Sequence, residues 1–296
     1  MVDGDVETAV RAARSWLYAP STRPEQFDSA ERDGADAVIL DLEDSVRPQD
    51  KSAARALVIE HLAAAPPGEL VTAVRINAAS TAVGLADLTA LLSADVAPDV
   101  LVLPRTESAG ALGVIENLLF EAGSRTMLVP LIETARGLRN LPRILASQTR
   151  VVGVLVGAAD VVADLGTPGD PEAMRSVRDS AVLAATSADV VVIDSPHFGG
   201  GDPDALAAET LRAARAGFTS KAAVTAEQIA TINDAFAPTE QELSWAHAVL
   251  KASSARDGAA SGTPEDEADA ARIRRYLQRA RPTGAPAPAP AAARAI

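Results

Sequence analysis

Eight short apolar runs recur along most of the chain, and they constrain the fold more than any other feature of the sequence. Each run is about the length of a β-strand, and successive runs lie roughly 20–30 residues apart. They span residues 15–20, 37–42, 71–76, 100–103, 127–132, 151–156, 190–193 and 218–224. Near-continuous apolar runs are typical of parallel strands that are covered on both faces. The sequence therefore predicts a buried parallel sheet.

Amphipathic stretches separate the apolar runs and predict one helix after each strand. They span residues 24–32, 49–62, 85–93, 111–122, 137–146, 171–185, 203–216 and 226–235. Pro203 and Gly217, at the start and just after the end of one stretch, are residues that open and close helices. Eight β–α units are the number in a TIM barrel, and an open doubly wound sheet is the alternative. We therefore predict an α/β fold, a (β/α)8 TIM barrel with a C-terminal helical extension.

The chain divides into four parts on this interpretation. Residues 1–13 are expected to be an N-terminal tail, and residues 14–238 the barrel. Residues 239–281 are expected to form the helical extension, with a helix at 239–253, a polar hinge at 254–264 and a second helix at 268–281. The Pro- and Ala-rich end, residues 282–296, cannot bury apolar area and is expected to be disordered.

Charge and composition exclude several functional classes. The 296 residues carry a net charge of −13 with only 3% aromatic residues, so a nucleic-acid partner is not expected. No apolar run reaches the roughly 20 residues of a membrane helix, so no membrane association is expected. There is no cysteine to form disulfides or a thiolate nucleophile. The acidic N-terminus does not resemble a secretory signal, and a cytoplasmic location is expected.

The segments that follow the predicted strands carry charged and amide groups that a barrel core would not tolerate. They are Asp41, Glu43, Asp44, Arg75, Asn77, Arg105, Glu107, Glu133, Asp160, Asp194 and Lys221. In a TIM barrel the carboxyl ends of the strands share one face, where active sites lie. Converging carboxylates repel one another, and a bound divalent cation relieves that repulsion.

The residue types available favour a hard cation. The three histidines are dispersed and cysteine is absent, so carboxylates and water would be the ligands. Such ligands favour Mg²⁺, with Mn²⁺ as the alternative. Glu133 and Asp160 end consecutive predicted strands and are the expected ligand pair. The alternative for this pair is a buried ion pair with Arg136 or Arg105.

Several strings of the sequence resemble one known family. They are RSWLYAPSTRPEQFDSAERDGADAVILDLEDSV (14–46), VRIN (74–77), LPRTES (103–108), PLIETARGL (130–138) and GAADVVADLG (157–166). In this order and spacing they are similar to the HpcH/HpaI aldolase and citrate lyase family, and within it to CitE-like proteins, relatives of the citrate lyase β subunit. The likeness covers about residues 14–255.

The resemblance implies a TIM-barrel homo-oligomer, a trimer or hexamer, that uses Mg²⁺ to cleave or form a carbon–carbon bond. The expected substrate is a hydroxy-dicarboxylyl-CoA thioester, which yields an acyl-CoA and a 2-keto acid. It also implies that Glu133 and Asp160 are magnesium ligands, with Glu133 also meeting the substrate, and that Arg75 binds the substrate carboxylate or the thioester oxyanion.

Further residues acquire roles from the same resemblance. Asp41, Glu43 and Asp44 match the acidic cluster beside the metal, and one of them or a metal-polarised water would move the proton. Arg14 and Arg23 belong to the segment that meets the CoA phosphates in relatives. Arg105 stands where lysine is common and is a further expected substrate contact.

The sequence also departs from the family pattern. Residues 220–229 read SKAAVTAEQI where relatives read GKxxIHPxQI, and the segment after residue 255 does not resemble the lid of malyl-CoA lyases. Alternatives therefore stay open. One is a Schiff-base aldolase that uses Lys221. Another is a metal-binding subunit with weak turnover that needs a partner such as an acyl-carrier protein. A third is thioesterase or malate-synthase-like activity at the same site.

Overall fold

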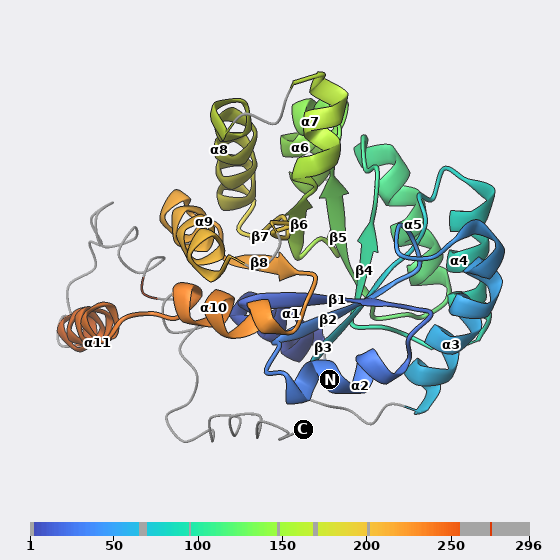
Figure 1. The fold of residues 1–296 in the computed structure, drawn as a ribbon, viewed down its shortest axis with the longest axis horizontal. Coiled ribbons are helices and arrows are strands. Elements are labelled where there is room, and N and C mark those ends of the chain that lie inside the picture. Colours follow the sequence, from blue (N-terminus) through green and yellow to red (C-terminus); the bar gives the residue numbers. More distant parts are fainter. Residues whose placement is uncertain are drawn as a thin grey trace.

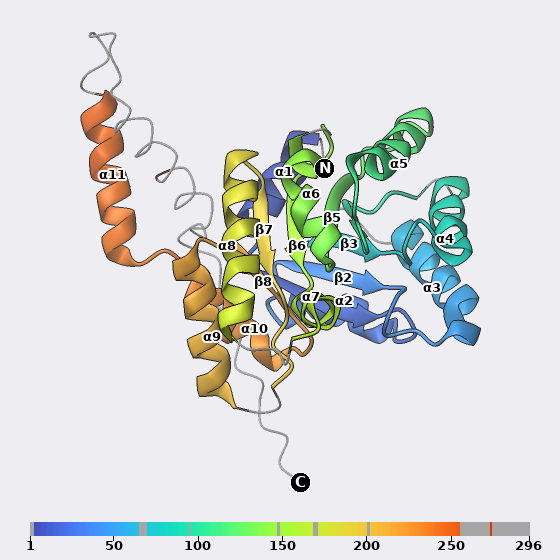
Figure 2. The same cartoon turned by 90° about the horizontal axis from the view of Figure 1, so that it is seen from above.

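A computed structural model describes residues 3–64, 70–94, 96–146, 149–167, 171–199, 202–254 and 273. Within them, eight parallel strands close into one barrel in sequential order (Figures 1 and 2). The strands are β1 (Ser15–Pro20), β2 (Ala37–Asp41), β3 (Val71–Arg75), β4 (Val100–Leu103), β5 (Met127–Ile132), β6 (Gly153–Val156), β7 (Val191–Asp194) and β8 (Ser220–Ala223). The pairing of β1 with β8 closes the barrel. The predicted TIM barrel is confirmed.

Helices alternate with the strands and surround them (Figure 1). They are α2 (Glu25–Arg32), the 3-10 helix η1 (Pro48–Asp50), α3 (Lys51–Ala64), α4 (Ala82–Ser93), α5 (Ala109–Glu121), α6 (Ala135–Ala146), α7 (Ala158–Leu165), α8 (Pro171–Ser187), α9 (Pro203–Ala216) and α10 (Glu227–Phe236). Each predicted strand is found within about two residues of its expected bounds. Helix α7 was not predicted, because it has only eight residues and is separated from the sixth apolar run by the single residue Gly157.

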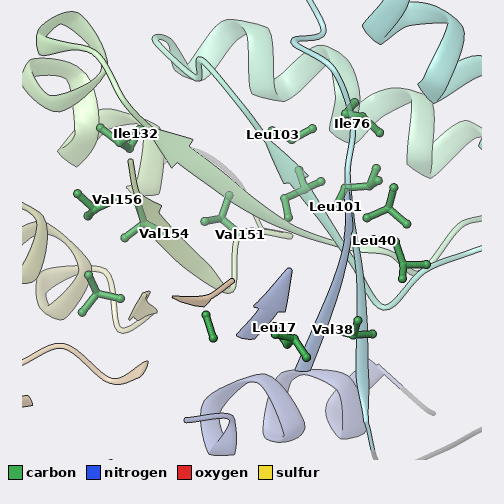
Figure 3. Close-up of a cluster of buried hydrophobic side chains, with 14 of the residues drawn as sticks. Leu17, Val38, Leu40, Ile76, Leu101, Leu103, Ile132, Val151, Val154 and Val156 are labelled. Carbon is green, nitrogen blue, oxygen red and sulfur yellow. The ribbon is translucent and has the colours of Figure 1, made fainter. Parts of the chain in front are cut away.

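The strands bury both of their faces, which explains their continuous apolar sequences. Along β2, Val38 and Leu40 belong to the outer layer between strands and helices, whereas Ala37 and Ile39 belong to the layer inside the barrel. This alternation follows from the two-residue period of a strand. Figure 3 shows outer-layer side chains from several strands, with Leu17 near Val38 and Val154 beside Val156.

The N-terminal segment corrects the prediction of a tail. Residues Asp3–Ala12 form helix α1, in which Val6 is 5% exposed and Val10 is fully buried. Both side chains pack with the layer inside the barrel, together with Trp16 of β1. Burial of these apolar groups stabilises the helix, so the segment is part of the folded barrel.

Helix α11 (Glu240–Ser254) follows the barrel and stands apart from its ring of helices in both views (Figures 1 and 2). It corresponds to the first helix of the predicted extension. The predicted hinge, the rest of the extension except Ile273, and the tail at 282–296 lie outside the described residues. None of the helices in the part of the chain that the structure describes has the length and apolar character to cross a membrane.

The loop between β3 and α4 is tied closely to the helix that follows it. The buried Asp87 carboxylate accepts hydrogen bonds from the backbone N–H and the Nδ2 of Asn77, at 2.9 and 2.6 Å. Arg55 of α3 donates to the same carboxylate at 2.8 Å. A Cβ atom on Gly84 would overlap the carbonyl oxygens of Ala78 and Asn77. The helix therefore approaches this loop at a distance that only glycine permits.

Replacing Gly84 with alanine is expected to lower the free energy of unfolding by about 1–3 kcal/mol, because the added methyl group overpacks the loop. Gly110 lies near the start of the next helix, α5, and a Cβ atom there meets nothing within 4 Å. Gly110→Ala is the matched control and is expected to stay within about 1 kcal/mol of the wild type, on the stabilising side. Urea unfolding measures both. Equal stability of the two variants would contradict the close approach.

Candidate active site

Strand register brings Asp41 and Arg75 together at the carboxyl ends of β2 and β3, where they are paired residues. Arg75 donates from Nε and Nη2 to the two oxygens of Asp41 at 2.7 and 2.8 Å. The backbone N–H groups of Glu43 and Ser45 also donate to this carboxylate. Burial tends to raise the pKa of Asp41, but the hydrogen bonds and charge of Arg75 hold it below its usual value. Asp41 therefore stays ionised and fixes the guanidinium.

The third guanidinium nitrogen of Arg75, Nη1, contacts two further acids, and an aromatic ring packs against the guanidinium group. Its Nη1 lies 3.1 Å from Asp44 Oδ2 and 3.0 Å from Glu43 Oε2. The contact with Asp44 is a hydrogen bond, whereas the Glu43 oxygen lies at ion-pair distance without one. The guanidinium carbon stacks 4.8 Å from the ring centre of Tyr18. Arg75 is thus contacted on all sides, and among its acidic partners the side chain of Asp44 is the most exposed, at 73%.

Glu43 lies behind Arg75 in a poorly solvated position. Burial raises its pKa from 4.5 to about 8, and the charge of Arg75 only partly offsets this effect. The nearby acids Asp44 and Glu133 raise the pKa further. The geometry alone would indicate an ionised pair with Arg75, but the missing hydrogen bond agrees with the dominance of burial. Burial therefore favours the protonated form of Glu43.

Glu133 directly follows β5 and points into the same end of the barrel. Its Oε1 accepts a hydrogen bond of 2.7 Å from the backbone N–H of Arg105. Arg105 has a φ of 50°, a left-handed conformation that is uncommon for a non-glycine residue. The strained turn thus aims a backbone donor at the carboxylate. A Cβ on Gly157 would lie 2.8 Å from the Cβ of Glu133, so glycine leaves room for this side chain.

Asp160 lies in the first turn of α7 and is exposed. The sequence placed it at the end of the sixth strand, but β6 ends at Val156 and the helix carries Asp160 over the barrel mouth. Burial raises the pKa of Glu133, and the charge of Asp160 raises it further. The negative charge of Asp160 therefore acts on Glu133 within the same cavity. A cation between the two carboxylates would relieve their repulsion.

A cavity of about 370 Å³ opens among these groups at the carboxyl ends of the strands. Its polar lining residues include Asp41, Asp44, Ser45, Arg75, Glu133 and Asp160. Most of the lining surface is apolar, and its apolar residues include Leu131, Leu155, Val156, Pro196, Phe198 and Val224. A small ligand with a charged end and an apolar end fits such a lining.

The structure brings most of the predicted site residues to this mouth, but not Arg14. Arg14 precedes β1 and therefore lies at the opposite end of the barrel, where its side chain binds Asp36 at 2.8 Å and is 8% exposed. The prediction that Arg14 meets a substrate phosphate is wrong for this reason. Arg23 and Arg105 are exposed on the loops after β1 and β4, outside the cavity lining. Arg105 contributes its backbone N–H rather than its charge.

Lys221 is closed off from the cavity. Its Nζ donates to Asp194 Oδ2 at 2.7 Å, to the carbonyl of Ser195 at 2.6 Å and to Glu209 Oε1 at 2.7 Å. The side chain is fully buried. All three N–H donors are used, so the amine is not placed to attack a carbonyl group. The geometry disfavours the Schiff-base alternative.

Other residues of the site were not found by sequence reasoning. They are Tyr18, Ser45, Gly157, Ser195, Pro196, Phe198 and Val224. Tyr18 had one usable signal, a polar-tipped ring two residues after the buried Trp16 on the face of β1 that points inward. Phe198 is 69% exposed in a loop, and a single exposed apolar residue carries no signal in a sequence.

Comparison with known proteins agrees with this site. The family model for HpcH/HpaI aldolase/citrate lyase matches residues 14–226. A citrate lyase subunit beta-like protein of Mycobacterium tuberculosis is 36% identical over 255 residues, which cover 84% of this chain and 88% of the relative. An L-malyl-CoA/beta-methylmalyl-CoA lyase of Cereibacter sphaeroides is 29% identical over 278 residues, 85% of this chain and 87% of the relative.

A solved structure is similar over most of the chain. It is the protein CitE from Mycobacterium tuberculosis in complex with magnesium, acetoacetate and coenzyme A. It superimposes with a TM-score of 0.72 at 33% sequence identity and covers 90% of this chain and 99% of that chain. The likeness therefore extends over the whole barrel.

The raised pKa of Glu43 predicts a specific pH dependence of stability. Between pH 4.5 and about 8 the folded protein keeps a proton that the unfolded chain releases, so this group lowers stability as pH rises. Glu43→Gln removes the titration and mimics the protonated form. We expect this variant to gain about 1–3 kcal/mol relative to the wild type between pH 5 and pH 8. Urea unfolding in EDTA at several pH values measures the difference, and parallel profiles would contradict it.

Proposed function

The chain belongs to the HpcH/HpaI aldolase/citrate lyase family, and from its site we propose that it is a Mg²⁺-dependent carbon–carbon lyase. It cleaves or forms the bond of a hydroxy-dicarboxylyl-CoA thioester, with an acyl-CoA and a 2-keto acid as the products. The observation that carries this proposal is the pair Glu133 and Asp160, which face Arg75 across one cavity. Two acids on one side and a cation on the other suit a substrate whose reacting end carries a keto acid.

The residues present fit a magnesium ion. Burial and the nearby charge of Asp160 raise the pKa of the Glu133 carboxyl, and Gly157 leaves space beside Glu133 Oε2. Among the described residues, no group of three or more His, Cys, Asp or Glu is arranged to hold a metal. A cation here would thus take two protein carboxylates and fill its other positions with water and substrate oxygens, as Mg²⁺ usually does. When bound, it acts as a Lewis acid on the keto-acid oxygens.

Arg75 is the group that recognises the anionic part of the substrate. Asp41 takes two of its donors and fixes its plane, and Tyr18 supports the guanidinium from one side. The exposed Asp44 occupies the position that a substrate carboxylate or a thioester oxyanion would take. Substrate therefore displaces Asp44 from Arg75 and forms a charge-assisted hydrogen bond in its place.

Proton transfer also fits the acidic cluster. Cleavage requires a base for the substrate hydroxyl and an acid for the enolate carbon. Of the three acids, Asp41 is committed to Arg75, and Glu43 does not line the cavity. Asp44 lines it, and once displaced by substrate it is free to take the hydroxyl proton.

The thioester end of the substrate also has room. A second hollow of about 350 Å³ adjoins the first at Ser45 and includes Thr22, Arg47 and Asp50. It lies at the barrel mouth, near the exposed Arg23. We propose that the nucleotide part of the thioester follows this direction, and that the protein is a homo-oligomer, a trimer or hexamer, as the family resemblance implies.

Replacing Glu133 with glutamine is expected to weaken Mg²⁺ binding at least about tenfold, the equivalent of about 1.4 kcal/mol, because one of two anionic ligands is lost. Calorimetric titration with Mg²⁺ measures the affinity. Glu107→Gln is the matched control, since Glu107 lies at the same mouth but does not line the cavity. Unchanged affinity in Glu133→Gln would refute the ligand assignment.

Arg75→Lys keeps the charge but loses the fork that Asp41 grips. We expect kcat/KM for thioester cleavage to fall by at least about 100-fold, with Mg²⁺ affinity unchanged. Release of 2-keto acid from a set of hydroxyacyl-CoA thioesters is the assay. Wild-type protein with no activity on any member of the set would count against the proposed function. Full activity of Arg75→Lys would show that Arg75 does not have the proposed role in substrate recognition.

A further inference from the structure

Two loops form one side of the cavity, which we call the apolar wall. The loop after β7 contributes Pro196 and Phe198, and the loop after β8 contributes Val224. Phe198 is 69% exposed and Val224 is 36% exposed, so both present apolar surface to whatever enters. The wall follows β7 and β8, next to β6 and the helix that carries Asp160, and it borders the same cavity as Arg75. The non-reacting substituent of a substrate held by Arg75 would lie against this wall.

A single side chain joins the two loops of the apolar wall. Gln228, in the first turn of α10, donates from Nε2 to the carbonyl of His197 at 2.9 Å. Its Oε1 accepts from the backbone N–H of Val224 at 2.9 Å. Both bonds go to the main chain, so they fix the path of the loops themselves. The separation of Val224 from the neighbours of His197 thus depends on the length of one glutamine.

Buried charged residues hold the loop after β7 in place. Lys221 holds the carbonyl of Ser195 at 2.6 Å and Glu209 at 2.7 Å. The other oxygen of Glu209 lies 2.7 Å from His197 Nδ1. A Cβ on Gly199 would come within 2.6 Å of the His197 ring, so the chain folds closely around the imidazole. With this loop fixed, the contact through Gln228 determines where the second loop stands.

We propose that Gln228 is a positioning residue. It fixes the distance between the two loops of the apolar wall and thereby limits the size of the substituent that the site accepts. The inference rests on the proposed function and concerns the selectivity of that same site. An apolar pocket discriminates between substrates that differ by one methylene by about 10–200-fold, provided its walls are held at a fixed distance. Loss of the two Gln228 hydrogen bonds lets the two loops of the apolar wall move apart, so larger substituents bind with little loss of affinity.

The test compares variants of two amides on the same helix. Gln228→Glu removes the donor to His197, and Gln228→Met removes both bonds without adding charge. Asn233 of α10 donates from Nδ2 to the carbonyl of Gly34 at 2.8 Å, away from the cavity. Asn233→Asp and Asn233→Met are therefore the matched controls for charge and for loss of a loop contact.

The measurement is kcat and KM for hydroxyacyl-CoA thioesters that carry hydrogen, methyl, ethyl or propyl at the non-reacting position. In the Gln228 variants we expect the ratio of kcat/KM between the preferred thioester and the next larger one to fall about 3–10-fold. KM should rise while kcat on the preferred thioester stays within about twofold, because Gln228 does not touch the reacting atoms. The Asn233 variants should keep the wild-type ratio.

Hydrogen exchange of residues 195–199 is the second readout and needs no turnover. We expect faster exchange in both Gln228 variants and unchanged exchange in the Asn233 variants. A wild-type selectivity ratio together with wild-type exchange in Gln228→Met overturns the inference while leaving the proposed function intact. If the wild type cleaves none of the thioesters, the proposed function fails, and the affinities of the same thioesters measured by calorimetry test the selectivity ratio on their own.

Discussion

The bidentate pair between Asp41 and Arg75 is the interaction on which the site depends. Register places the two residues side by side at the ends of adjacent strands, and the hydrogen bonds and charge of Arg75, together with backbone donors after β2, lower the pKa of the Asp41 carboxyl. A guanidinium gripped in this way has one plane and one free edge. That edge, Nη1, contacts the partly buried Glu43 and the 73% exposed Asp44, and Arg75 lines the cavity. The barrel thus presents a fixed cation toward a ligand at little reorganisation cost.

A second part of the cavity lining contains two carboxylates, Glu133 and Asp160, that repel each other. Glu133 is held by a backbone N–H from a strained turn, and Asp160 is brought over it by α7. Neither acid has a cationic side chain as a hydrogen-bonding partner among the contacts described for it, and burial raises the pKa of Glu133. Such an arrangement is unfavourable by itself and is stabilised by any cation that enters. The cavity therefore has a side that attracts anions, at Arg75, and a side that attracts cations, at Glu133 and Asp160.

The sequence predicted the strands and the polar groups directly after them, because an apolar run ends where a barrel strand ends. Asp41, Arg75 and Glu133 were found in this way. Arg14 was misplaced although strand direction alone puts a residue before β1 at the opposite end of the barrel. Asp160 was predicted at the correct end of the barrel but on a strand instead of a helix, because the sequence carries no strong signal for the start of α7. Gln228 could not be predicted, because its contacts are to backbone atoms of loops distant in sequence.

Lys221 shows why residue type and register together still do not define chemistry. Asp194 and Lys221 are paired at the ends of β7 and β8, as Asp41 and Arg75 are at the ends of β2 and β3. The first of these pairs is sealed by Glu209 and the carbonyl of Ser195, with both side chains fully buried. The second is completed by an acid that is 73% exposed. An ion pair that is fully buried can only hold loops in place. An ion pair with an exposed further partner can exchange that partner for a ligand. The two pairs therefore differ in the exposure of their further partners, and only the pair of Asp41 and Arg75 has a largely exposed one.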